Sequence, residues 1–247
     1  MNRRRFLIGA AAAASVRPQN DVSFFDGQTV LFAGVQYYLS DIIVPSPSPL
    51  SGDPDPGAQI AQAVLEDIRR EGRLIGAGGA RDRWARLTGP VRWRANDASA
   101  EGGRETSLQE LLLERGAARV APESDDFAFI DRCFAAEEKA RGGKTGAWRD
   151  PDWRIRDAAR AEPAFGFQIF AGAVMRAEER RGRIYFNFGE DYRSDFTASV
   201  RASNFRRWKK KFDPAALVGA RIETRGLVER INGPSIELTH EKQLRML

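Results

Sequence analysis

The chain is poor in the residues from which metal and thiol sites are usually built. Its 247 residues include one cysteine, Cys133, and one histidine, His240. A single cysteine excludes an internal disulfide, and a single histidine excludes sites made of paired histidines or of Cys/His clusters. No apolar run approaches the roughly 20 residues that a membrane-spanning helix needs. We therefore expect neither zinc hydrolase chemistry nor a transmembrane span.

The composition favours folded, globular domains. Hydrophobic residues make up 42% of the chain and charged residues 30%, which rules out disorder, collagen and coiled coil as descriptions of the whole. A chain of this length usually forms one or two domains of roughly 100 to 150 residues each. The charged, proline-containing stretch 149–163 lacks a clear hydrophobic period. We place a domain boundary there, with residues 151–163 as the linker.

The first residues have the anatomy of an export signal. Residues 1–16 combine a basic start, a short apolar run and a series of alanines. Arg3 and Arg4, followed closely by Phe6 and Leu7, resemble the twin-arginine signal. The resemblance implies export to the periplasm after folding in the cytoplasm. It does not decide whether the signal is cleaved or kept as an anchor.

The two halves of the chain beyond this signal differ in charge. Residues 15–155 carry 18 basic and 22 acidic side chains, a net charge of −4, whereas residues 156–247 carry 18 and 12, a net charge of +6. The signal adds three arginines and no acid, so the whole chain has a net charge of +5. We expect any polyanion to prefer the second half.

Strand patterns and helix patterns both occur in the first half. Residues 22–45 are typical of strands, and 45–56 form a proline-rich loop. Spacing and capping residues then predict three helices whose apolar stripes belong to the core. The first begins with Asp55 as its cap and Pro56 at its first position and ends at Gly72; the second runs from a Ser107/Glu110 capping box to Gly116; the third runs from about Asp126 to Arg141.

The second half predicts five strands with one helix between the third and the fourth. The helix is expected at 204–212, and the Asn232-Gly233 pair predicts a hairpin between the last two strands. This order of elements is that of the OB-fold, a small barrel often used for oligonucleotides and other polyanions. The strands are expected at 165–176, 183–188, 195–201, 220–230 and 234–239.

Several segments of the first half, taken in series, resemble the thermonuclease (staphylococcal nuclease-like) family. They are Asp26–Val30, Tyr38–Pro45, Asp82–Arg86, Leu108–Val120 and Glu137–Trp148. The resemblance covers roughly residues 22–150 and implies an OB-type barrel with three helices. The mature chain would then be a mainly β protein with helices (α+β), consisting of two tandem OB barrels at 20–150 and 164–247.

The resemblance also implies a largely lost hydrolytic centre. The family cleaves nucleic-acid phosphodiesters with Ca²⁺, a general-base glutamate and two phosphate-binding arginines. Only Arg86 matches one of these positions, that of the second arginine. The other positions hold Gln28 and Ile43 for the metal-binding aspartates, Val44 for a threonine, Tyr38 for the first arginine and Ser46 for the glutamate. A shifted alignment puts Leu31 at the first arginine instead. We expect no metal site and no cofactor.

Candidate residues for binding a polyanion gather in the second half. A short helix carries a cluster of cations that could neutralise phosphates, although a solvated charged face is the alternative. Strand alternation predicts that Ile184, Phe186 and Phe188 point into the core. Tyr185 and Arg201 then point outward, where they are candidates for stacking and for phosphate contact. The cluster consists of Arg206, Arg207, Lys209, Lys210 and Lys211.

Three functional hypotheses follow. The main one is an exported thermonuclease-family protein that binds single-stranded nucleic acid or another polyanion, chiefly through residues 156–247, without hydrolysing it. The second is an active calcium-dependent nuclease in which Asp26, Asp41 and Asp82 gather around Arg86; only this hypothesis requires Ca²⁺. The third is a structural or protein-interaction module of the cell envelope, with a protein partner. The sequence identifies neither the ligand nor the oligomeric state.

Overall fold

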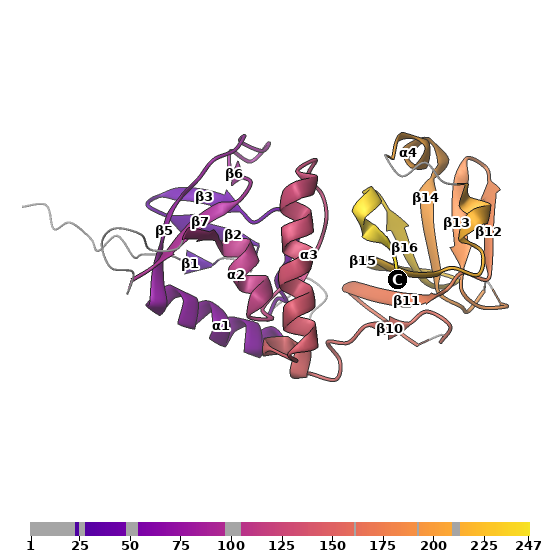
Figure 1. The fold of residues 1–247 in the computed structure, drawn as a ribbon, viewed down its shortest axis with the longest axis horizontal. Coiled ribbons are helices and arrows are strands. Elements are labelled where there is room, and N and C mark those ends of the chain that lie inside the picture. Colours follow the sequence, from indigo (N-terminus) through magenta and orange to yellow (C-terminus); the bar gives the residue numbers. More distant parts are fainter. Residues whose placement is uncertain are drawn as a thin grey trace, which may run out of the picture.

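Strands make up most of the regular structure, and a few helices pack against them. The computed structural model describes residues 23–24, 28–47, 54–96, 105–160, 162–191, 193–208 and 213–247. Helix α3 (Phe127–Gly142) stands between two groups of strands, one from each half of the chain (Figure 1). The prediction of a mainly β fold with helices is confirmed. Among the described residues, no helix is long and apolar enough to cross a membrane.

The described residues of the first half form short strands and three α-helices. These elements are β1 Ser23–Phe24, β2 Thr29–Phe32, β3 Val35–Tyr38, β4 Ile42–Ile43, α1 Ala58–Glu71, β5 Gly72–Ala77, β6 Leu87–Thr88, β7 Val91–Ala95, β8 Glu105–Ser107, α2 Leu108–Glu114, β9 Arg119–Val120 and α3, followed by a 3₁₀ turn, η1 Gly146–Arg149. The strands pair in the orders β1-β2-β3-β6 and β5-β7-β8, and β4 pairs with β9. The predicted signal (residues 1–16) and Asp26 lie outside the described residues.

Local capping explains where two of the three helices begin. The Ser107 hydroxyl accepts the Glu110 N–H at 3.0 Å at the start of α2, and the Asp126 carboxylate accepts the Phe129 N–H at 3.0 Å at the start of α3. Each cap satisfies a backbone donor that the first helical turn leaves unpaired. Both predicted starts are confirmed.

The predicted cap of α1 is wrong. The helix begins at Ala58, and its cap is Gly57 rather than Asp55. Gly57 has a φ of 75°, and a Cβ there would lie 2.6 Å from the Cβ of Ala147, so the position requires glycine. Asp55 instead accepts the Ser46 N–H at 2.8 Å. The residue that excludes a side chain at this cap lies 90 positions away, and no local pattern reveals it.

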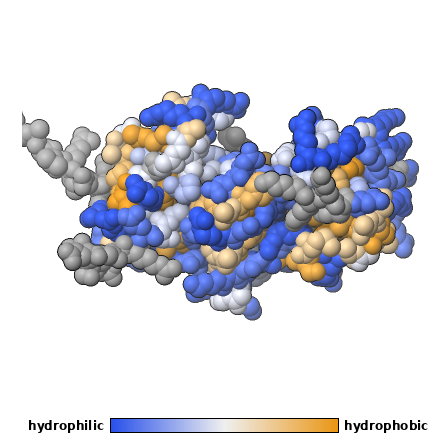
Figure 2. Space-filling model, turned by 45° about the horizontal axis from the view of Figure 1, so that its top comes forward, coloured by the Kyte–Doolittle hydropathy of each residue, from blue (hydrophilic) through white to orange (hydrophobic). Residues whose placement is uncertain are grey.

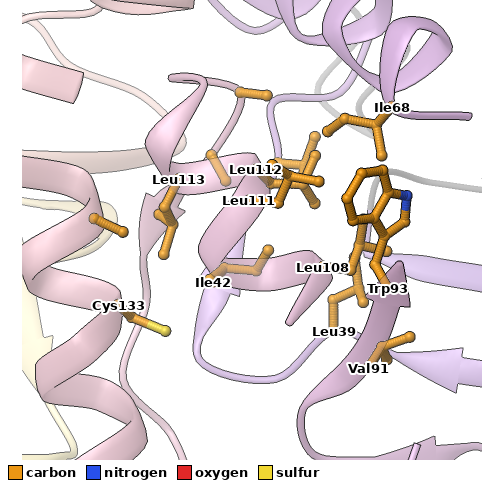
Figure 3. Close-up of a cluster of buried hydrophobic side chains, with 14 of the residues drawn as sticks. Leu39, Ile42, Ile68, Val91, Trp93, Leu108, Leu111, Leu112, Leu113 and Cys133 are labelled. Carbon is orange, nitrogen blue, oxygen red and sulfur yellow. The ribbon is translucent and has the colours of Figure 1, made fainter. Parts of the chain in front are cut away.

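The core of the first half lies among the three helices and the strands. Ile68 of α1, Leu112 of α2 and Cys133 of α3 belong to one buried cluster with Ile42 and Trp93 (Figure 3). The apolar stripes of the predicted helices therefore form core, as expected. Burial raises the pKa of the Cys133 thiol, which keeps it protonated and unreactive.

The second half forms one curled sheet. Its elements are β10 Arg156–Asp157, β11 Phe167–Ala173, β12 Arg176–Arg180, β13 Arg183–Asn187, β14 Thr197–Arg201, α4 Ala202–Arg207, η2 Pro214–Leu217, β15 Arg221–Ile231, β16 Gly233–Leu238, η3 Glu241–Gln243 and β17 Leu244–Met246. The strand order is β10-β11-β15-β16-β14-β13-β12, with β14 and β16 parallel. Because β12 follows β11 in the chain, the two ends of the path from β11 to β12 are neighbours in sequence.

Several predicted elements of the second half are refined. The strand predicted at 165–176 is bent into β11 and β12, and α4 is shorter than the predicted 204–212 because Trp208 is already extended, with ψ 143°. Asn232 has a φ of 65° in the tight turn between β15 and β16, so the hairpin prediction is confirmed. The stretch 151–163 includes β10, which pairs with β11.

A buried network of charges joins the halves. The Arg225 guanidinium of β15 is fully buried and donates to Glu137 of α3 at 2.8 Å and to Glu223 at 2.5 Å. Arg141 of α3 reaches Glu223 at 3.0 Å. Although burial alone would raise the pKa of Glu223, Arg225 and Arg141 hold it below its usual range. Each of these charges is therefore compensated within the protein.

Candidate functional site

Arg86 lines a cavity of about 800 Å³ on the first half, which we call the Arg86 cavity. Its wall includes the loop around residues 78–90 and the start of α3. Several carboxylates share this wall. The charged lining residues are Asp41, Asp82, Arg86, Glu123 and Asp126.

The Arg86 guanidinium is held by neighbours on several sides. Its Nε donates to Asp82 at 2.8 Å, and its Nη1 donates to the Thr29 hydroxyl at 3.0 Å. Its Cζ lies 4.3 Å from the ring centre of Tyr38 and 4.9 Å from that of Trp84. The other Asp82 oxygen accepts the N–H groups of Trp84 and Arg86, each at 2.9 Å, which folds the motif into a tight turn. Arg86 is thus oriented by the protein itself.

The acidic side chains of this cavity also accept hydrogen bonds from the protein. Asp41, with a φ of 63° and 1% exposed, accepts the N–H groups of Glu123 and Ser124, each at 2.9 Å. The Tyr38 hydroxyl donates to Glu123 at 3.2 Å, and burial together with the Glu123 charge raises the pKa of Tyr38 to about 12. Burial and the Asp41 charge raise the pKa of Glu123. These carboxylates hold the loop before α3 in place.

Most of the replaced family positions lie away from the cavity. The Gln28 amide donates to the carbonyl of Leu39 at 2.8 Å and to that of Ile42, so it supports the turn between β3 and β4. Val44 is buried, and the shifted alignment places Leu31 within β2. Of the replacing residues at these positions, only Tyr38 lines the Arg86 cavity within the described part of the chain.

Two of the three acids in the nuclease hypothesis share the cavity with Arg86. They are Asp41 and Asp82, and Asp26 lies outside the described residues. Within the described ranges, no group of three or more His, Cys, Asp or Glu side chains could hold a metal ion. The carboxylates of the described residues orient Arg86 and the loop before α3.

A second cavity, of about 660 Å³, lies on the outer face of β12, β13 and β14. We call it the β13 groove. Ile184 and Phe186 point into the core at 2% and 0% exposure, so Tyr185 between them faces the groove, as the alternation predicts. Four arginines line the groove with Tyr185: Arg176, Arg180, Arg181 and Arg183.

Acidic side chains partly neutralise the positive charge of the β13 groove. Glu178, Glu229 and Glu237 also line it. Glu237 accepts from Arg183 at 3.1 Å and lies 3.5 Å from Arg201, the predicted phosphate contact, which sits beside the groove and opposite Arg183 in the strand register. Part of the basic character is therefore neutralised at one edge.

The structure places only part of the predicted basic cluster. Arg206 and Arg207 form the last turn of α4, and Arg206 lies 3.7 Å from Glu179 of β12. Lys209, Lys210 and Lys211 lie outside the described residues. The sequence did not lead us to predict that the arginines of the hairpin between β12 and β13 belong to the binding site. Their density in the sequence, together with the alternation around Tyr185, was the signal that could have identified them.

No protein-family model matches the chain, and no curated protein matches it. The thermonuclease resemblance therefore stays a prediction from the series of sequence motifs.

Proposed function

We propose that this protein binds single-stranded nucleic acid, or a polyanion of similar charge spacing, in the β13 groove. In this proposal the chain is an exported relative of the thermonucleases whose Arg86 cavity no longer hydrolyses phosphodiesters. The strand order supports an OB-type barrel in the second half. The path β12-β13-β14-β16-β15-β11 joins two strands that follow each other in the chain, and β14 is parallel to β16. The motif series of the first half supports a second such barrel.

The arrangement around Tyr185 carries the proposal. An aromatic ring on an open strand face offers a stacking platform, worth about 1–3 kcal/mol per base. The flanking Arg176, Arg180 and Arg181 have guanidinium groups that can contact phosphates. Tyr185 with these arginines therefore combines the two interactions that bind a single strand without reading its sequence.

The surrounding surface supports the same function. The second half carries the net positive charge of the chain. In Figure 2, hydrophilic side chains cover the end of the molecule that β12 and β13 form in Figure 1. Because three glutamates line the groove as well, we expect moderate affinity that falls steeply with salt.

The Arg86 cavity supports the loss of hydrolysis. A missing general base typically lowers a rate by about 10²–10⁴-fold, and a missing charge-stabilising donor by about 10²–10³-fold. Here Asp82 and Thr29 already engage the single arginine that matches the family. Such an arginine can still bind a phosphate through its remaining donors, but little catalysis would survive.

The test follows binding and cleavage together. Labelled single-stranded DNA and RNA are titrated with the purified chain, with and without calcium, and anisotropy and product size are measured. We expect binding without cleavage, weakened about tenfold by Tyr185→Ala and unchanged by Arg73→Gln, which removes an exposed cation of the first half. Equal affinity of the Tyr185→Ala variant and the parent chain would contradict the proposal.

The same experiment addresses the two other hypotheses. Because Asp41 and Asp82 share the cavity with Arg86, calcium-dependent cleavage that Arg86→Ala abolishes would establish the nuclease. Absence of binding at low salt, where electrostatic attraction is strongest, would favour the envelope interaction module with a protein partner.

A further inference from the structure

A third cavity, of about 250 Å³, lies where the two halves of the chain meet. The first half contributes Ile43 and Arg119, the connecting segment contributes Trp153, and the second half contributes Phe167 and Leu227. We call it the Arg119 cavity. Crevices between domains that combine an apolar lining with a few polar groups are the usual places for small ligands.

Arg119 is unusual among the buried charges of the described residues. It is 1% exposed, and its Nη1 donates to the Phe167 carbonyl at 2.9 Å. Its Nε and Nη2 have no hydrogen-bond partner. These two atoms form one edge of the guanidinium, and that edge matches the two oxygens of a carboxylate.

Among the described residues, no carboxylate accepts a hydrogen bond from this edge. Glu137 is the acid whose charge acts most on Arg119, but one of its oxygens accepts the Val120 N–H at 3.1 Å and the other binds Arg225 at 2.8 Å. Burial, with the nearby charges of Arg225 and Arg156, lowers the pKa of Arg119 to about 9, so the guanidinium remains charged at neutral pH. Glu137 and Asp55 offset part of this charge, but they leave the two donors unpaired. Unpaired buried donors are costly, and a carboxylate that accepts from them would remove that cost.

The walls of the cavity suit an apolar body. Trp153 is 4% exposed, and the centre of its ring lies 3.7 Å from the Arg119 guanidinium carbon. Leu227 is 64% exposed and lies opposite Phe167 in the register of β11 and β15. Large exposed apolar side chains next to a cavity mark a place where apolar surface can be covered.

Two acids at the cavity restrict the charge of the occupant. Asp55 and Asp152 both line it, and Asp55 already accepts the Ser46 N–H at 2.8 Å. They repel any anion, and a polyanion such as a nucleic-acid backbone more strongly than a monocarboxylate. An anionic occupant therefore has to carry a single carboxylate and direct it to Arg119, away from these two acids. The β13 groove and the Arg119 cavity therefore select different ligands.

We propose that the Arg119 cavity binds a small apolar monocarboxylate. The carboxylate accepts from Nε and Nη2 of Arg119, and the apolar body lies among Trp153, Phe167 and Leu227. An occupant that binds only the folded chain raises its stability by RT ln(1 + L/Kd), where L is the free ligand concentration, so the melting temperature should rise with ligand concentration.

Calorimetric titration of the full chain with phenylacetate tests the site, with phenylacetamide and acetate as comparisons. We expect phenylacetate to bind and to raise the melting temperature. Phenylacetamide, which lacks the charge, and acetate, which lacks the apolar body, should each bind at least about tenfold more weakly. Equal binding of phenylacetate and phenylacetamide, or no binding of phenylacetate at millimolar concentration, would overturn the proposal.

Variants then identify which residues of the Arg119 cavity bind phenylacetate. Arg119→Met should weaken phenylacetate binding about 10- to 100-fold. Arg119→Lys keeps the charge but loses the two-donor edge, so its affinity for phenylacetate should lie between those of the parent chain and of Arg119→Met. If Arg119→Met does not fold, Leu227→Glu decides, because it places a repelling carboxylate at the exposed mouth. Its matched control is Ile231→Glu, which changes an equally exposed residue of the same strand outside the cavity, at 62% exposure. Equal loss of phenylacetate binding in both glutamate variants would refute the site.

Discussion

The Arg86 cavity and the β13 groove use arginine in opposite ways. In the Arg86 cavity, Asp82 and Thr29 engage the guanidinium and two aromatic rings cover it. In the β13 groove, Arg180 and Arg181 lie exposed at the tip of a hairpin. An arginine whose donors are used inside the protein contributes to stability, whereas one that faces solvent remains available to a ligand. Whether an arginine's donors are used inside the protein thus distinguishes arginines that stabilise the fold from arginines that can bind a ligand.

The largest expected effect comes from removing a buried arginine that pairs with two acids inside the protein. Arg225→Ala leaves Glu137 and Glu223 buried without their partner, and we expect the free energy of unfolding to fall by about 3–5 kcal/mol. Urea denaturation measures this change. Arg181→Ala serves as the exposed control and should change the stability by less than about 0.5 kcal/mol. Similar losses in the two variants would remove the distinction between internal and exposed arginines.

A smaller effect is expected when exposed arginines of the groove are neutralised. The double variant Arg180→Gln/Arg181→Gln should reduce the slope of log affinity against log salt by about 2, because each cation releases roughly one counterion. Its melting temperature should match that of the parent chain. Anisotropy titrations of a labelled single strand at several salt concentrations provide the slopes. An unchanged slope would place the polyanion elsewhere on the molecule.

The stability at mildly acidic pH should depend on His240, which lies near the wall of the Arg86 cavity. Its Nδ1 accepts the Lys242 N–H at 3.1 Å, which only the unprotonated nitrogen can do. Burial lowers the pKa of His240, although Asp41 and Glu241 oppose the shift. The unfolded chain therefore binds the proton more tightly, and stability should fall as the pH drops through about 6.5 toward the lower folded value.

Thermal unfolding between mildly acidic and neutral pH checks this dependence. His240→Asn keeps an acceptor at the cap but does not titrate, so the decrease below neutral pH should be smaller in the variant than in the parent chain. Identical pH profiles of the two proteins would show that other groups cause the decrease.

The smallest effect is expected for Tyr185→Phe. Stacking depends on the ring, so removal of the hydroxyl should change the affinity for a single strand less than about threefold. Anisotropy at fixed salt measures it. If this variant lost as much affinity as Tyr185→Ala, the hydroxyl rather than the ring would make the contact, and the groove would bind by hydrogen bonding.

Local sequence signals predicted a large part of the fold. The caps Ser107 and Asp126 located α2 and α3, and the Asn232-Gly233 pair located the hairpin between β15 and β16, because these devices act within a few residues. Alternation placed Tyr185 on the outer face. The start of α1 was missed because it depends on the contact of Gly57 with Ala147, which lies far along the chain.

The candidate sites were predicted less completely. Arg86 and Tyr185 were found from a motif and from alternation, respectively. Thr29, which binds Arg86, and Glu123, which binds Tyr38, belong to no local pattern. The Arg119 cavity draws on three separate parts of the chain, so periodicity and motif spacing contain no trace of it.

The sequence by itself determined the starts of α2 and α3 and most strands of the second half, because hydrophobic period, capping and turn residues act over short distances. It also determined that positive charge would concentrate in the second half. Only the tertiary structure decided which arginines are used internally and which remain available. That outcome depends on burial and on partners from distant segments: Arg225 meets Glu137 across the two halves, whereas Arg119 is buried between them with two donors unpaired.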